Sequence, residues 1–246
     1  MADWNCRLYY AMGISHEVIA MLPPWFERRD KLAAGAPDAL HQSLAAGRVG
    51  ARLRPLSSAE RPDLRFFEAL ACPAAAAAML PPGRYRMIAA RNGWLPWLDR
   101  MLVRRCVAHL RTDAPPQLRL LCRIDPDSLS DAAFVAELEA FAAESPALAS
   151  RLAVALGRTR LPAPARAVLA SLRDRGIAVA FRRVARHRAA PAELRRLGFD
   201  IVQIELDAGA RVPSSSRFAA AGLVLVVGHT DAGPVLELSD AQPSAA

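Results

Sequence analysis

Residues 176–206 have the sequence GIAVAFRRVARHRAAPAELRRLGFDIVQIEL. This stretch contains two short apolar segments, Ile177–Phe181 and Phe199–Leu206, which predict strands, and between them Pro191–Leu197, which predicts one or two helical turns. A strand, a crossover and another strand within about thirty residues is typical of a βαβ unit in a parallel sheet. The stretch therefore predicts an α/β fold.

The first of these strands ends in a run of basic residues. In βαβ units the chemistry lies just past the carboxyl end of each strand. Five basic residues occupy that place: Arg182, Arg183, Arg186, His187 and Arg188. A site lined by arginines can hold an anion, but it cannot hold a divalent metal ion.

Other segments extend the same pattern along the chain. Predicted helices cover residues 38–46, 95–110, 131–144, 163–173 and 217–221, and predicted strands cover residues 51–56, 64–72, 118–124, 151–156, 223–227 and 235–238. The first two strands are close together and joined by a polar turn, which favours an antiparallel hairpin. From residue 118 onward strands and helices alternate, which indicates a parallel sheet or barrel. The alanine run at 74–78 is interpreted as a connector.

Composition limits the partners that the chain is expected to have. The chain has 246 residues, a formal net charge of +8 and a single lysine, Lys31, so that almost all of its basic residues are arginines. A positive surface favours acidic partners. Nucleic acid is disfavoured because the arginines are scattered and few aromatic residues are available to stack on bases.

The chain divides into residues 1–35, a predicted N-terminal extension that packs on the rest, and a main domain, residues 36–246. A short helix is expected at Glu17–Leu22, and packing on the domain is favoured over membrane binding. The four cysteines have no metal-binding or redox spacing. With no secretory signal and no apolar run of about 18 residues, a cytoplasmic protein without a membrane span is expected.

Several segments, taken in order, resemble one bacterial family. They are PDALHQSLAAGRVGARLRPL (37–56), LRFFEALAC (64–72), LRLLCRIDPDSLSDAAFVAELEAF (118–141) and the stretch 176–206. The second contains Glu68-Ala69-Leu70, and the series as a whole resembles the EAL domain, the cyclic di-GMP phosphodiesterase family, from about Pro37 to Val227. The resemblance implies a TIM-like (β/α) barrel with an antiparallel first strand. Too few residues follow Val227 for a closing helix and strand, so an abbreviated barrel is expected, with an edge that invites pairing with another chain.

Active members of the family need carboxylates and an amide around two divalent cations, together with a general base and a lysine. By resemblance, Glu68 takes the place of a metal-ligand glutamate and Glu205 that of an aspartate, and the two are a remnant of the metal site. At the other positions the family residue is replaced: a glutamine by Arg54, a phosphate-binding arginine by Cys72, an asparagine by Arg123, a glutamate by Ala155, another acid by Arg158, two aspartates by Arg182 and Arg183, a lysine by Gln203, and a glutamate by Gly228, with Asp231 nearby.

These replacements predict an inactive relative that uses no metal or other cofactor. Guanidinium groups are permanently cationic, and two unit charges about 4 Å apart at an effective dielectric of about 20 repel by roughly 4 kcal/mol. A divalent cation doubles that repulsion, so the pocket is expected to reject Mg²⁺.

The arginines at positions 54, 123, 158, 182 and 183 are expected to meet at the barrel mouth, and three roles remain open for them. They can form internal ion pairs with Glu68 and Glu205, bind an acidic protein partner, or bind an anion such as cyclic di-GMP. The favoured function is that of a regulatory or protein-binding module in bacterial signalling. A non-hydrolysing receptor for cyclic di-GMP or another anionic nucleotide is the alternative, and an active phosphodiesterase is a distant third. A homodimer also remains open.

Overall fold

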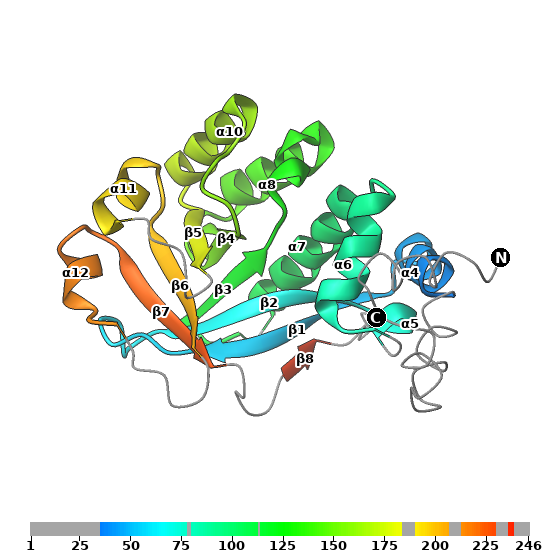
Figure 1. The fold of residues 1–246 in the computed structure, drawn as a ribbon, viewed down its shortest axis with the longest axis horizontal. Helices are drawn as coiled ribbons and strands as arrows, with labels where there is room; N and C mark the ends of the chain where they lie inside the picture. The colour runs from blue at the N-terminus through cyan, green and yellow to red at the C-terminus, as the bar shows by residue number, and fades with distance from the viewer. Residues whose placement is uncertain are drawn as a thin grey trace, which may run out of the picture.

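A computed structural model describes residues 35–77, 80–112, 114–183, 190–206, 213–229 and 236–238. Its centre is one eight-stranded sheet with the order β7-β6-β5-β4-β3-β2-β1-β8 (Figure 1). Strands β2 to β7 run parallel, whereas β1 is antiparallel to both β2 and β8. The strands are β1 (Val49–Leu56), β2 (Arg65–Pro73), β3 (Leu118–Arg123), β4 (Leu152–Leu156), β5 (Ala178–Arg183), β6 (Ile201–Leu206), β7 (Val224–His229) and β8 (Leu236–Leu238).

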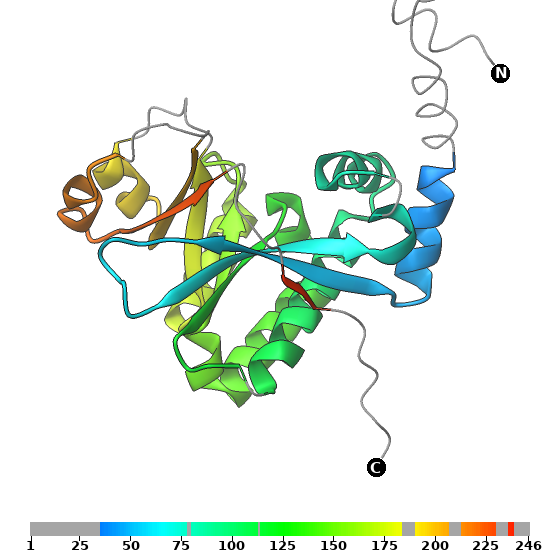
Figure 2. The same cartoon turned by 90° about the horizontal axis from the view of Figure 1, so that it is seen from below.

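The sheet curls until β1 approaches β7. Ser57, just after β1, forms an isolated antiparallel bridge with Val227 in β7, and two backbone hydrogen bonds of 2.8 Å hold it. The result is an abbreviated TIM-like barrel with an antiparallel first strand, as the sequence predicts. Strand β8 covers β1 over Ala51–Leu53 (Figure 2). The expectation of a free edge for another chain is therefore wrong along that part of β1, because the chain pairs with itself there.

The helices lie outside the sheet, and those that follow β5 are short (Figure 1). Within the described residues, seven α-helices precede β5: α4 (Ala36–Ala45), α5 (Ala74–Ala77), α6 (Pro82–Arg91), α7 (Leu95–Arg111), α8 (Ala132–Glu144), α9 (Pro146–Ala149) and α10 (Ala163–Asp174). After β5 come α11 (Pro191–Arg196) and α12 (Ser216–Ala219), of six and four residues. A 3₁₀ helix, η1 (Pro126–Ser130), follows β3.

Local chemistry explains several of these boundaries. Asp131 caps α8, since its carboxylate accepts a 2.9 Å hydrogen bond from the Phe134 backbone N–H. Gly47 follows the end of α4 with φ of +66°, the left-handed conformation that ends many helices.

The predicted order of elements is confirmed, with boundaries that differ by a few residues. The connector interpretation of residues 74–78 is wrong, because Ala74–Ala77 form α5. The sequence interpretation also missed α6, η1 and α9. The predicted helix Glu17–Leu22 and the packing of residues 1–35 on the domain fall almost entirely outside the described residues, and both stay predictions.

Strand alternation divides the apolar residues into two groups. On β4, for example, Leu152, Val154 and Leu156 belong to the large core between the sheet and the helices, whereas Ala153 and Ala155 belong to a smaller cluster inside the curled sheet. The inner cluster also contains Leu56, Phe66, Leu121, Ala180, Ile201 and Val226. The inward positions beyond these, toward the carboxyl ends of the parallel strands, form the barrel mouth.

Candidate functional site

Four charged side chains meet at the barrel mouth: Arg54, Glu68, Arg182 and Glu205, here called the four-charge cluster. Arg54 on β1 lies opposite Glu68 on β2 in the antiparallel register. Arg182 lies at the end of β5, and Glu205 near the end of β6. Arg54 precedes an inner-cluster residue by two positions, Glu68 and Arg182 each follow one by two, and Glu205 follows Ile201 by four. Because all these offsets are even, alternation along the strands turns the four side chains inward.

Each carboxylate of the cluster contacts both guanidinium groups. Arg54 Nη2 donates to Glu68 Oε2 and to Glu205 Oε1. Arg182 Nη2 donates to Glu205 Oε1 at 2.6 Å, and Arg182 Nε lies 3.0 Å from Glu68 Oε1 without the alignment of a hydrogen bond. Glu68 is completely buried and the other three side chains are about four-fifths buried. The cluster thus joins β1 and β2 to β5 and β6 across the mouth.

Titration of the cluster follows from these contacts. Burial raises the pKa of Glu205, but the charges and hydrogen bonds of Arg182 and Arg54 outweigh burial and leave that pKa below its usual value. Burial lowers the pKa of Arg54, while Glu68 and Glu205 raise it and prevail. Glu205 and Arg54 are therefore both ionised at neutral pH.

Gly228 on β7 provides space for the cluster. It is the register partner of Glu205, and a Cβ atom built on it would lie 2.8 Å from Leu56 Cδ2 and 3.8 Å from Arg54 Cζ. A longer side chain could enter only if Leu56 and Arg54 moved. The Arg54 guanidinium thus adjoins the space into which a side chain at position 228 would project.

The residues present do not fit the two divalent cations that the family resemblance implies. Glu68 and Glu205 are already bound by guanidinium groups, Ala155 and Gly228 carry no ligand atom, and Asp231 lies outside the described residues. Among the described residues, no group of three or more His, Cys, Asp or Glu side chains is placed to hold a metal ion.

Gln203 lies on β6 beside Arg182, with which it is paired in register. Its side chain is completely buried, and neither its amide oxygen nor its amide nitrogen has a hydrogen-bond partner within the described protein. A buried amide without partners costs free energy, so this position is unusual for a purely structural residue.

The remaining predicted arginines have different surroundings. Arg123 ends β3 on its inward face, half-buried, and burial together with the charges of Arg182 and Arg86 lowers its pKa to about 10. Arg158 instead pairs with Asp125 at 3.1 Å and lies 3.7 Å from Asp127. The side chain of Arg183 and the whole of Arg186, His187 and Arg188 lie outside the described residues.

A second charged group, which sequence reasoning missed, holds the segment after β3. The completely buried Asp99 on α7 accepts hydrogen bonds from Arg86 at 2.7 Å, from the Asp125 backbone N–H at 2.7 Å and from Ser128 Oγ at 2.8 Å. Arg86 also donates to the Arg123 carbonyl at 3.5 Å. The available signal was an acid at position 99 within the apolar stripe of the helix.

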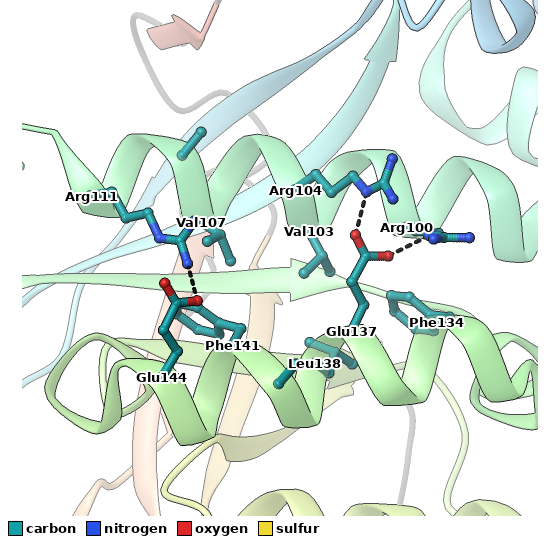
Figure 3. Close-up of a pocket in the computed structure, with 12 residues that line it drawn as sticks. Arg100, Val103, Arg104, Val107, Arg111, Phe134, Glu137, Leu138, Phe141 and Glu144 are labelled. Atoms are coloured by element: carbon teal, nitrogen blue, oxygen red, sulfur yellow. Dashed lines mark hydrogen bonds and ion pairs between the residues drawn. The ribbon is translucent and has the colours of Figure 1, made fainter.

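A surface groove of about 360 Å³ lies between α7 and α8 (Figure 3). Its apolar floor includes Phe134 and Phe141, and ion pairs span it: Arg100 and Arg104 both contact Glu137, and Arg111 donates to Glu144 at 2.6 Å. Sequence reasoning assigned nothing to this groove. These five charged side chains are all engaged in ion pairs between the two helices.

None of the helices in the described ranges has the length and apolar character that a bilayer crossing requires.

Comparisons with known proteins agree on one family. The family model described as EAL domain matches residues 38–234. The fold is similar to that of the EAL domain of Xanthomonas citri FimX in complex with c-diGMP, with 19% identity and a TM-score of 0.60 over 85% of this chain and 95% of that chain. An EAL domain protein from Listeria monocytogenes EGD-e is 13% identical, with a TM-score of 0.59 over 79% of this chain and 91% of that one.

A Vibrio cholerae LapD fragment with an S helix, GGDEF and EAL regions, bound to c-di-GMP, gives 9% identity and a TM-score of 0.60 over 79% of this chain and 56% of that one. No curated protein matches the chain. At these identities the structural likeness concerns the fold, while the family match covers most of the sequence. The chain belongs to the EAL domain family.

Proposed function

We propose that this EAL domain is catalytically inactive and acts as a regulatory, protein-binding module in bacterial signalling, in the cytoplasm. The four-charge cluster is the observation that carries the proposal. Glu68 and Glu205, the acids at the part of the mouth that the structure describes, each contact both Arg54 and Arg182. The groups that would bind metal in an active relative therefore bind arginine.

Charge makes this arrangement incompatible with two-metal catalysis. Mg²⁺ takes oxygen ligands, usually including one or two carboxylates. Binding it here would require the ion pairs to open and a divalent charge to lie beside fixed cations. A guanidinium about 4 Å away opposes a divalent ion by roughly 8 kcal/mol at an effective dielectric of about 20.

The residues that replace the family's catalytic groups are also unsuited to general-base catalysis. The family's lysine position is occupied by Gln203, whose neutral amide does not titrate in the physiological range. A general base must exchange a proton near the working pH. Neither the amide nor a guanidinium meets that requirement.

The alternative function is a receptor that binds cyclic di-GMP without hydrolysing it. Two observations favour it: the EAL domain of FimX and the LapD fragment, which share this fold, were solved with c-di-GMP bound, and the mouth of this chain presents arginines suited to phosphate. The likeness of this chain to the FimX and LapD structures concerns the fold only. We therefore keep this function second.

A turnover assay tests inactivity. The full chain is incubated with cyclic di-GMP and Mg²⁺ or Mn²⁺, and the linear product is separated by chromatography. We expect no product above the protein-free control, because the cluster excludes both cations. Turnover that disappears in Glu68→Ala would reveal an active phosphodiesterase with an unfamiliar residue set.

Calorimetry and affinity capture then separate the two binding functions. Micromolar binding of cyclic di-GMP that is lost in Arg182→Glu, and kept in Arg119→Glu at the opposite end of the barrel, would favour the receptor. No detectable binding at millimolar cyclic di-GMP would exclude the receptor function. A protein captured from the native cell by the wild type and Arg119→Glu, but not by Arg182→Glu, is the result expected for the leading proposal.

A further inference from the structure

Arg123 is the one guanidinium at the described part of the mouth that no carboxylate of the described residues pairs with. It lies on the inward face of β3, two residues beyond Leu121, which belongs to the inner cluster. Its side chain is half-buried. A partly desolvated cation that makes no ion pair is costly, and in a folded protein it is expected to find an anion.

The nearby acids are already engaged elsewhere. Glu68 and Glu205 each contact both arginines of the four-charge cluster. Asp99 is paired with Arg86, and Asp125 with Arg158. Counting Arg123 with the cluster, three guanidinium groups face two carboxylates, so the described part of the mouth has one positive charge in excess.

The position of Arg123 is fixed by buried groups. Arg86 donates to its backbone carbonyl at 3.5 Å, and Asp99 accepts from the backbone N–H of Asp125, two residues further on, at 2.7 Å. Asp99 is completely buried and Arg86 is nearly so. A binding group held in this way loses little freedom when it meets a ligand.

Gln203 supplies an independent indication that the mouth receives a polar group. Its side-chain amide is fully buried on the inward face of β6, beneath Glu205. Among the described residues, neither the amide nitrogen nor the amide oxygen has a hydrogen-bond partner. Buried amides almost always have partners. A polar occupant of the mouth would supply them.

We propose that the mouth binds a single monoanionic oxyanion group, a carboxylate or a phosphodiester, with Arg123 as the residue that recognises it. This inference rests on the proposed function, because it names the chemistry that the binding module recognises. One excess positive charge matches one negative charge, and the guanidinium fork matches two oxygens of either group. The carboxylate would come from an acidic side chain or chain end of a protein partner, and the phosphodiester from a nucleotide.

The pKa of Arg123 agrees with this assignment. Burial lowers it, Arg182 and Arg86 lower it further, and the charges of Glu68 and Glu205 offset only part of the effect, which leaves the pKa at about 10. An oxyanion beside the guanidinium would offset that repulsion and raise the pKa again.

Small probes test the subsite directly. The thermal unfolding midpoint of the full chain is followed in sodium acetate and in sodium dimethyl phosphate, at an ionic strength held constant with sodium chloride. Ligands that bind the folded state raise the midpoint. The unfolding midpoint of the wild type is expected to rise with at least one probe. A larger rise with acetate identifies a carboxylate as the ligand, and a larger rise with dimethyl phosphate identifies a phosphodiester.

The decisive comparison is between Arg123→Gln and Arg119→Gln. Arg119 lies on the same face of β3 at its other end and donates to the carbonyls of Pro116 and Leu118 at 2.7 and 2.9 Å, so its replacement removes the same charge far from the mouth. Arg123→Gln should lose about tenfold or more in affinity for the probe, the value of a hydrogen bond to a charged group. Arg119→Gln should bind as the wild type does.

Arg123→Lys gives a second variant that keeps the charge but lacks the fork, and we expect it to bind more weakly than the wild type. No response of the wild type beyond that in chloride, or equal binding by the wild type and both Arg123 variants, would overturn the subsite. Neither outcome would affect the inactivity proposal. Conversely, hydrolysis of cyclic di-GMP would overturn the proposed function whatever the probes show.

Discussion

Small residues on the inner faces of β4 and β5 determine what the barrel mouth can contain. Inside most TIM barrels, bulky branched side chains fill the interior. Here the inward residues of these two strands are alanines, and the large residues that alternate with them face the helices; the inward alanines are Ala153, Ala155, Ala178 and Ala180. Alanine leaves volume unfilled, and the arginines of β1, β3 and β5 can extend into it. The side chains that accommodate the charges are thus themselves uncharged.

Replacing Glu205 by Gln tests the four-charge cluster. Although burial alone would raise it, the pKa of Glu205 lies below its ordinary value of 4.5 because of Arg182 and Arg54. A carboxyl group with a lowered folded-state pKa stabilises the protein above the unfolded-state pKa and loses that contribution as the pH falls through the folded-state pKa. We expect Glu205→Gln to lower the free energy of unfolding by about 2 kcal/mol at pH 7, with the difference shrinking below pH 4.5.

Urea unfolding of both proteins across that pH range measures the effect. Asp63→Asn, which breaks an exposed pair with Arg61, serves as the control and should change stability little. A difference between wild type and Glu205→Gln that stays constant into the acid range would show that ionisation of Glu205 contributes nothing.

At the scale of elements, Asp99 connects α6, α7 and η1. It is paired with the nearly buried Arg86 and accepts from the backbone of the segment that follows β3. Removing one partner of a buried pair leaves an uncompensated charge and costs about 3–5 kcal/mol. Asp99→Asn keeps the shape of the side chain, so we expect its free energy of unfolding in guanidinium chloride to fall by that amount.

Glu137→Gln is the matched comparison for Asp99→Asn, because Glu137 also joins two elements but lies about one-third exposed. Surface pairs contribute about 1 kcal/mol or less. Equal losses in the two variants would mean that burial of the Asp99 pair has no energetic consequence.

The elements also show what the sequence could predict. Long periodic segments such as Leu95–Arg111 and the apolar strands were found because their patterns repeat over several residues. Three of the missed helices, α5, η1 and α9, have only four or five residues, and Ala74–Ala77 lacks any polar residue that would reveal a period. The fourth, α6, has ten residues, but only Tyr85 and Ala89 are buried, so its sequence shows no extended apolar stripe. Family resemblance placed Arg54, Glu68, Arg182 and Glu205 together. The resemblance could not predict which arginine pairs with which acid. In the structure Arg158 pairs with Asp125, whereas Arg123 pairs with no carboxylate of the described residues.

At the scale of the whole molecule, the abbreviated barrel is closed with few residues. The bridge between Ser57 and Val227 joins β1 to β7, and the four-charge cluster spans the same gap above it. Strand β8 protects the other part of the β1 edge. An unprotected edge strand is a template for pairing with another chain, so β8 has a protective role that its length of three residues would not suggest.

Gly50 permits that protection, because a Cβ atom at this position would lie 2.8 Å from the carbonyl oxygen of Leu238. We therefore expect Gly50→Ala to displace β8, and a chain ending at residue 229 to lack it altogether. Both should self-associate more strongly than the full chain as concentration rises in sedimentation velocity, because the edge at 51–53 becomes free. A chain ending at residue 238 retains β8 and should sediment as the full chain does. If the chain ending at 229 sedimented identically to the one ending at 238, the edge would need no cover, and the twist of the sheet alone would keep it from pairing.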